Sequence, residues 1–147
     1  SIRANAFDYE KMAMGRERLE YYINDYKAKK ADGTISNVED DELKDMRIVQ
    51  EMYARGFEFV PIDIYKAKAR SFQIIDGKIM PSFKVISKVG ESAGESIEIA
   101  ARDGEFLSKD DLRQRARIGQ TVIEKLGELG LLDGMAESNQ LSLFDVI

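Results

Sequence analysis

Helix-start signals recur along this 147-residue chain, and they constrain its fold more than its overall composition does. The signals are Asp8 ahead of an apolar-periodic run, Ser36-Asn37-Val38-Glu39, and Ser108 three residues before Asp111. A serine or aspartate in this position accepts a hydrogen bond from the first helical turn, and a glutamate three residues later can return one. We therefore expect a mainly helical chain in which each of these signals begins a helix.

The first two expected helices lie in residues 1–56. Apolar residues recur at three- and four-residue steps over residues 7–30, and Gly33 is expected to end that helix. A second helix is expected from Ser36 to Arg55, with Gly56 beyond it. Its predicted apolar stripe consists of Val38, Met46, Val49 and Tyr53. The two helices are predicted to form an antiparallel pair.

The acidic run from Glu39 to Glu42 has two possible roles. Carboxylates bind magnesium or calcium, but negative charge in the first turn of a helix also complements the helix dipole. We favour the dipole interpretation and predict no metal site. The chain has neither cysteine nor histidine, which excludes disulfides and thiolate zinc sites and removes the commonest general base. Carboxylates, lysines and hydroxyls are the groups left for any catalysis.

A small β-hairpin is expected after these helices. From Phe57 to Ile64 the apolar period changes to two, and Pro61 limits this run to an edge or irregular strand. Asp76-Gly77 suits a two-residue turn between the short strands that flank it. Three cations, Lys66, Lys68 and Arg70, could meet phosphate, although a solvated face is the favoured interpretation. The expected fold class is mainly α with a small β-hairpin.

Residues 83–106 resemble a helix-hairpin-helix element, in which a turn through Val89 and Gly90 leads into a second helix near Glu91. Helix N-termini present backbone N–H groups to anions, and such contacts to phosphates give position without reading base sequence. The residues assigned to duplex DNA are Lys88, Val89, Gly90, Glu91, Ser92 and Ala93. Lys88 stands where members of this family usually carry glycine. The alternative is an ordinary packed helical hairpin.

A second, degenerate hairpin is expected within residues 108–130. Arg113, Arg115 and Arg117 are expected to converge near Gly119 as the strongest local basic patch. The residues assigned to DNA there are Arg117, Gly119 and Gln120. Arginines that complement the end of a surface helix are the alternative interpretation. Residues 57–134 are thus assigned to a β-hairpin plus tandem helix-hairpin-helix domain that binds DNA.

Residues 135–147 are expected to form a flexible tail that a partner captures. Leu141, Leu143 and Phe144 would stand in water unless a partner or the domain buried them. The pentapeptide consists of Gln140, Leu141, Ser142, Leu143 and Phe144. It resembles, at every position, the motif with which bacterial polymerases and repair proteins dock on the sliding clamp. We assign these five residues to clamp binding.

Together these motifs resemble the C-terminal end of a PolC-type DNA polymerase III α subunit. The residues that carry the resemblance are Gly56-Phe57-Glu58-Phe59, Ile62-Asp63-Ile64-Tyr65-Lys66, the Asp76-Gly77 turn before Pro81, the hairpin at Gly90, the run from Asp103 to Leu112, and Gln140 to Phe144. The resemblance implies a parent DNA-directed DNA polymerase whose nucleotidyl transfer depends on magnesium. Its catalytic carboxylates would lie upstream of Ser1, so the resemblance implies that this fragment holds neither catalytic residues nor a cofactor.

The implied role is to position primer–template duplex DNA and to tether the polymerase to the sliding clamp. An accessory region of a DNA repair enzyme, or a purely structural helical domain with a folded-back tail, remain alternatives. A net charge of −5 argues against binding to DNA by bulk electrostatics, but backbone N–H groups do not require a basic domain. No apolar run approaches 18 residues, so no membrane partner is expected and the cytoplasm is the expected compartment. The start at Ser1 suggests a piece of a longer chain.

Overall fold

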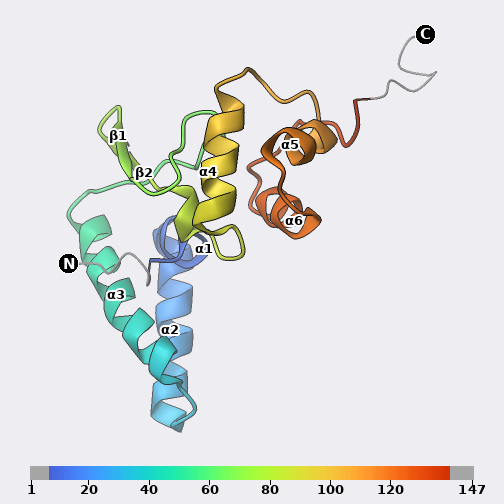
Figure 1. The fold of residues 1–147 in the computed structure, drawn as a ribbon. Coiled ribbons are helices and arrows are strands. Elements are labelled where there is room, and N and C mark those ends of the chain that lie inside the picture. The colour runs from blue at the N-terminus through green and yellow to red at the C-terminus, as the bar shows by residue number, and fades with distance from the viewer. Residues whose placement is uncertain (1–6, 140–147) are drawn as a thin grey trace. The chain divides into compact units, whose positions relative to one another are not determined.

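The computed structural model describes residues 7–139, which form helices and one small β-hairpin (Figure 1). The elements are α1 (Tyr9–Met12), α2 (Arg16–Asp32), α3 (Asn37–Ala54), β1 (Gln73–Ile75), β2 (Lys78–Met80), the 3-10 helix η1 (Phe83–Val85), α4 (Gly90–Ala101), α5 (Lys109–Ala116) and α6 (Gln120–Glu128). The expected fold class, mainly α with a small β-hairpin, is confirmed. Each helix within residues 7–139 is too short or too polar to span a bilayer.

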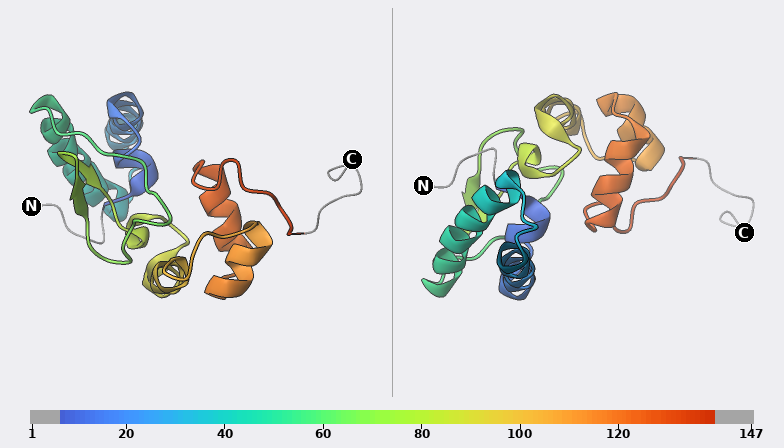
Figure 2. Two further views of the ribbon diagram at one scale, coloured as in Figure 1. Left: turned by 90° about the horizontal axis from the view of Figure 1, so that it is seen from above. Right: turned by 90° about the horizontal axis from the view of Figure 1, so that it is seen from below.

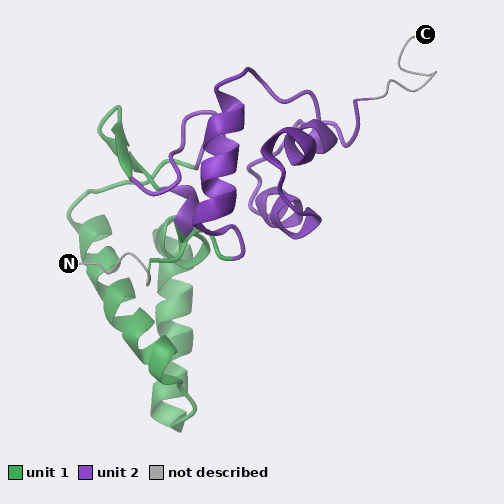
Figure 3. Cartoon of the chain, in the orientation of Figure 1, with its two compact units in different colours: residues 1–61, 72–81, 85–87 green, residues 62–71, 82–84, 88–147 purple. Residues whose placement is uncertain are grey.

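The chain divides into two compact units whose segments alternate along the sequence (Figure 3). Unit 1 takes the described parts of residues 1–61, 72–81 and 85–87, and unit 2 takes those of residues 62–71, 82–84 and 88–147. The segments predicted from sequence, residues 1–56, 57–134 and 135–147, are divided by expected function and not by contacts. That division stays a prediction.

The first predicted helix is interrupted in the structure. Asp8 caps α1 by accepting a hydrogen bond from the Lys11 backbone N–H at 3.1 Å, as expected. The chain then breaks helical conformation before α2, because Gly15 adopts a φ of +107°, which L-residues rarely take. The prediction of one helix over residues 7–30 is therefore wrong. Met12 and Leu19, on either side of the break, are both fully buried.

Helices α2 and α3 form the predicted antiparallel pair and lie side by side in Figures 1 and 2. Ion pairs of 2.8 Å from Lys29 to Glu39 and 3.1 Å from Lys30 to Asp40 join the end of α2 to the start of α3. The capping box of Ser36 and Glu39 is present as expected.

The predicted stripe of α3 needs one correction. Val38 is 74% exposed, because it lies in the first turn of α3 directly after the α2–α3 loop. Leu43 takes its place in the core, where Met46 and Val49 are also buried.

The β-hairpin forms as predicted. β1 pairs antiparallel with β2, and the turn residues Asp76 and Gly77 have φ values of 51° and 80°. Two consecutive positive φ values are typical of the tight type I′ turn. The alternating run from Phe57 contributes one parallel bridge, between Phe59 and Ile79, rather than a full strand.

The core of unit 2 brings α4 close to the segment that precedes it. A Cβ atom on Gly94 would lie 2.8 Å from the Cβ of the fully buried Phe83, so only glycine permits this approach. The segment 67–70 runs beside both: Phe83 N–H donates to the Lys68 carbonyl at 3.0 Å, and Ala69 N–H donates to the Glu98 carboxylate at 2.7 Å. The middle and the C-terminal half of α4 are thereby held against Phe83 and residues 67–70.

Candidate nucleic-acid interface

The first hairpin joins η1 to α4 through Lys88, Val89 and Gly90. Lys88 and Gly90 have φ values of 72° and 74°, in the left-handed region, and both residues are exposed. Val89 lies between them with its side chain 5% exposed. The buried valine fixes the turn, while the residues on either side of it face solvent. Val89 can thus contribute only its backbone to an interface.

The start of α4 has no side-chain cap. Val89 occupies the N-cap position and makes no side-chain hydrogen bond to the first turn. The first N–H groups of a helix have no intrahelical acceptor and favour an anion. Glu91 and Ser92 are exposed and Ala93 is half-buried, so most of this first turn is accessible. The DNA-binding residues predicted for the first hairpin therefore lie at one accessible helix start.

Lys88 adopts a left-handed backbone conformation, which glycine takes without steric cost. A non-glycine residue in the left-handed region costs about 1 kcal/mol or more. The hairpin nevertheless forms with lysine there, and the side chain of Lys88 adds a positive charge to its exposed edge. Lysine at this position is thus compatible with the tight turn before α4.

The second hairpin joins α5 to α6 with the same order of residue types. Arg117 adopts a φ of 54° and is exposed, and Ile118 is 8% exposed. Gly119 then occupies the N-cap position of α6 without a side-chain hydrogen bond. Its φ of −83° is an ordinary value, unlike that of Gly90. Gln120, the first residue of α6, is exposed.

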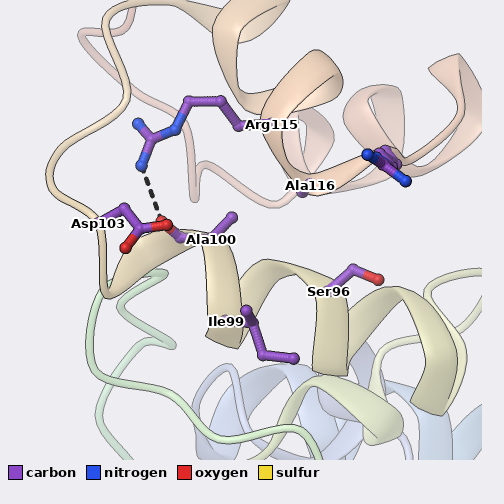
Figure 4. A pocket seen from close by; sticks show the side chains of 7 residues that line it. Ser96, Ile99, Ala100, Asp103, Arg115 and Ala116 are labelled. Carbon is purple, nitrogen blue, oxygen red and sulfur yellow. Dashed lines mark hydrogen bonds between the residues drawn. The ribbon is translucent and has the colours of Figure 1, made fainter.

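The predicted convergence of three arginines at the second hairpin is wrong. Arg115 turns toward the end of α4, where Figure 4 shows its hydrogen bond to Ala100, and it donates to three backbone carbonyls in all. These are the carbonyls of Ala100 at 2.7 Å, Glu105 at 2.9 Å and Gly104 at 3.0 Å. Arg113 lies 3.8 Å from Asp110. Because carbonyl acceptors leave no mark in a charge pattern, the structural role of Arg115 could not be found from sequence.

A groove of about 300 Å³ lies between α4 and α5, within unit 2 (Figure 4). It is lined by Ser96, Ile99, Ala100, Asp103, Arg115, Ala116 and Arg117. The guanidinium of Arg115 is already engaged with carbonyls, and it also stacks 4.5 Å above the Phe106 ring. The exposed Arg117 is the groove's remaining cation. The groove therefore adds little beyond the second hairpin for binding an anion.

The acidic run at the start of α3 is structural in this chain. Lys29 and the Ser36 backbone N–H bond to Glu39 and lower the pKa of its carboxyl to about 2. Lys11 lies 2.6 Å from Glu42. Residues 7–139 contain no group of three or more acidic side chains placed to hold a metal ion. The described contacts of this run are thus those of a capped helix start and its ion pairs.

The chain following α6 returns to the start of α5. Backbone N–H groups of Lys109 and Asp110 donate to the carbonyls of Ala136 at 2.8 Å and Glu137 at 3.1 Å. Ser108, which caps α5 as predicted, also donates to the Asn139 side chain. The assigned clamp-binding residues, Gln140, Leu141, Ser142, Leu143 and Phe144, lie outside the described residues. The described part of the tail is thus held on α5.

Comparison with known proteins agrees with the two-hairpin geometry. The helix-hairpin-helix motif family matches residues 56–141. The chain is 41% identical, over 99% of its length, to the DNA polymerase III PolC-type of Streptococcus suis (strain 98HAH33), and 40% identical to that of Streptococcus pneumoniae serotype 2 (strain D39). It spans about a tenth of the length of these curated relatives. The resemblance to PolC-type polymerases predicted from sequence is confirmed.

Proposed function

The chain belongs to the helix-hairpin-helix family, and on that premise we propose that it is a module of a replicative DNA-directed DNA polymerase. The module would hold primer–template duplex through its backbone and tether the polymerase to the sliding clamp. The observation that carries the proposal is the pair of hairpins that each lead into a helix with no side-chain cap. Nucleotidyl transfer and its magnesium would belong to other parts of such a cytoplasmic polymerase.

The duplex contact would be made with phosphates rather than base edges. At both hairpins the accessible groups are backbone N–H groups at a helix start and one exposed cation, Lys88 or Arg117. Such contacts fix position on a duplex without reading its sequence. They also allow binding by a chain whose net charge is −5, because local dipoles rather than net charge attract the phosphate.

A titration of the 147-residue chain with two duplexes of unrelated sequence tests this contact. Equal affinities that fall together as salt rises are expected, because phosphate contacts release counterions whatever the base sequence. Binding to one duplex alone, or affinity that does not change with salt, would contradict a backbone contact. Absence of binding to either duplex at low salt would remove the DNA-binding part of the proposal.

The clamp contact would be made by the tail after Asn139. Burial of three large apolar side chains gives roughly 5–9 kcal/mol, from which ordering of the segment removes about 2–5 kcal/mol. The contact alone would therefore be micromolar or weaker. Residues 136 and 137 are held on α5, so a clamp bound to the tail would stay close to the hairpins. The clamp contact and the duplex contact, each weak alone, would then reinforce each other.

Titration into purified sliding clamp tests the tail. We expect the 147-residue chain to bind, a copy that ends at Asn139 not to bind, and the double variant Leu143→Ala, Phe144→Ala to lose binding without unfolding. The truncated copy keeps residues 7–139, so its fold serves as the control. Equal binding by the full chain and the truncated copy would show that the tail is not the clamp ligand.

A further inference from the structure

A cation from outside both hairpins lies against the first turns of α4. The Nε atom of Arg70 is 3.3 Å from the Glu91 carboxylate, and its guanidinium also contacts the Glu95 carboxylate. The backbone beside Arg70 is held in place, because Ala69 N–H bonds to Glu98 and the Ala69 carbonyl accepts from Lys84 N–H at 3.0 Å. The segment that carries Arg70 is thus fixed to the same helix as the two carboxylates.

The two carboxylates create an electrostatic problem for a phosphate at this helix start. Glu91 is the second residue of α4, beside the backbone N–H groups that would meet the phosphate, and Glu95 follows one turn later on the same face. Like charges at such separations repel. Without a nearby cation, this edge of the first hairpin would disfavour the ligand that its backbone suits.

We propose that Arg70 is a positioning residue of this phosphate site: it holds Glu91 and Glu95 and neutralises part of their charge, so that a duplex phosphodiester can approach the start of α4. The inference rests on the proposed duplex contact of the first hairpin. It adds a residue that comes from a different segment of the chain, residues 62–71 of unit 2.

Charge counting gives an expected pattern for three variants. One guanidinium and two carboxylates carry a local charge of −1 in the native chain. Arg70→Gln changes this charge to −2, Glu91→Gln changes it to 0, and the double variant restores −1. For a phosphate about 7 Å away at about 0.1 M salt, each unit of charge changes affinity by roughly threefold.

The experiment measures duplex affinity of the 147-residue chain and these three variants at matched salt. The control is Arg102→Gln, which removes the same positive charge as Arg70→Gln. Arg102 is an exposed arginine at the far end of α4, where it pairs with Glu98 at 3.0 Å. Roughly 18 Å of helix separate it from the first turn, well beyond the Debye length, so its affinity should stay native. Thermal unfolding of each variant checks that the fold is kept.

The proposal predicts that Arg70→Gln binds about threefold more weakly, Glu91→Gln about threefold more tightly, and the double variant like the native chain. An Arg70→Gln affinity equal to that of Arg102→Gln would overturn it. A double variant that stays as weak as Arg70→Gln would also overturn it, because Arg70 would then act independently of Glu91. Failure of the proposed function can be told apart from failure of the Arg70 inference, because in the first case the native chain itself would bind no duplex.

Discussion

The two hairpins share an order of residue types but differ in how their backbones turn. Each has a cation in the left-handed region, a buried branched residue and then a glycine at an uncapped helix start: Lys88-Val89-Gly90 in the first and Arg117-Ile118-Gly119 in the second. In the first, the glycine also has a positive φ, whereas Gly119 has an extended conformation that any residue adopts. The first turn therefore depends on glycine, and the second does not.

The hairpins also differ in what holds them. The second is tied to the end of α4 by Arg115, which donates to carbonyls of the α4–α5 connection. The first is held by backbone contacts of residues 67–70 and by the close approach of Gly94 to Phe83. The comparison indicates that backbone conformation and backbone contacts hold the first hairpin, whereas the side chain of Arg115 holds the second.

The largest expected effect is on the side-chain anchor of the second hairpin. Arg115→Ala should lower the free energy of unfolding by about 2–3 kcal/mol, because it removes the donor to the partly buried Ala100 carbonyl and to two exposed carbonyls, together with the Asp111 ion pair and the Phe106 stacking. Arg113→Ala is the matched control, since Arg113 makes a long, exposed ion pair of 3.8 Å with Asp110, and the cost of this change should stay below about 0.5 kcal/mol. Urea unfolding measures both, and equal costs would contradict the anchoring role.

The glycines test the backbone difference directly. Gly90→Ala should destabilise the chain by about 1–2 kcal/mol, because alanine is strained at a φ of +74°. Gly119→Ala should cost less than about 0.5 kcal/mol, because its φ is ordinary and no atom lies within 4 Å of the added Cβ. Thermal unfolding of the two variants compares them, and the reverse order would show that the turns had been assigned wrongly.

The smallest expected effect concerns the two cations with positive φ. Lys88→Gly and Arg117→Gly should each stabilise the chain by up to about 1 kcal/mol, because glycine relieves the left-handed strain while adding unfolded-state entropy. Lys88→Ala keeps the left-handed strain and removes the positive charge. Its DNA affinity therefore separates the effect of the charge from the effect of the strain. Loss of stability in both glycine variants would mean that the side chains make contacts worth more than the strain.

Local signals in the sequence predicted most of the fold. The caps at Asp8, Ser36 and Ser108, the Asp76-Gly77 turn and the first hairpin all depend on residues close together in the chain, and all are present. The break before α2 was missed because Met12 and Leu19 are seven residues apart, a spacing that also suits an uninterrupted helix.

Tertiary features were beyond such local signals. The inward turn of Arg115 and the pairing of Arg70 with Glu91 join segments that periodicity and charge patterns treat separately. At the candidate site, sequence therefore predicted the turns and the backbone donors. It did not predict which cations face solvent and which are engaged within the fold.

The most direct test of the central claim is the duplex affinity of Gly90→Val beside that of Gly119→Val, measured with two unrelated duplexes at one salt concentration. We expect Gly90→Val to weaken binding about tenfold or more to both duplexes alike, since it disturbs the turn that presents the backbone donors of α4. Gly119→Val should weaken it by less than about threefold. Native affinity in Gly90→Val, with helicity intact, would contradict the assignment of the first hairpin as a DNA-binding element.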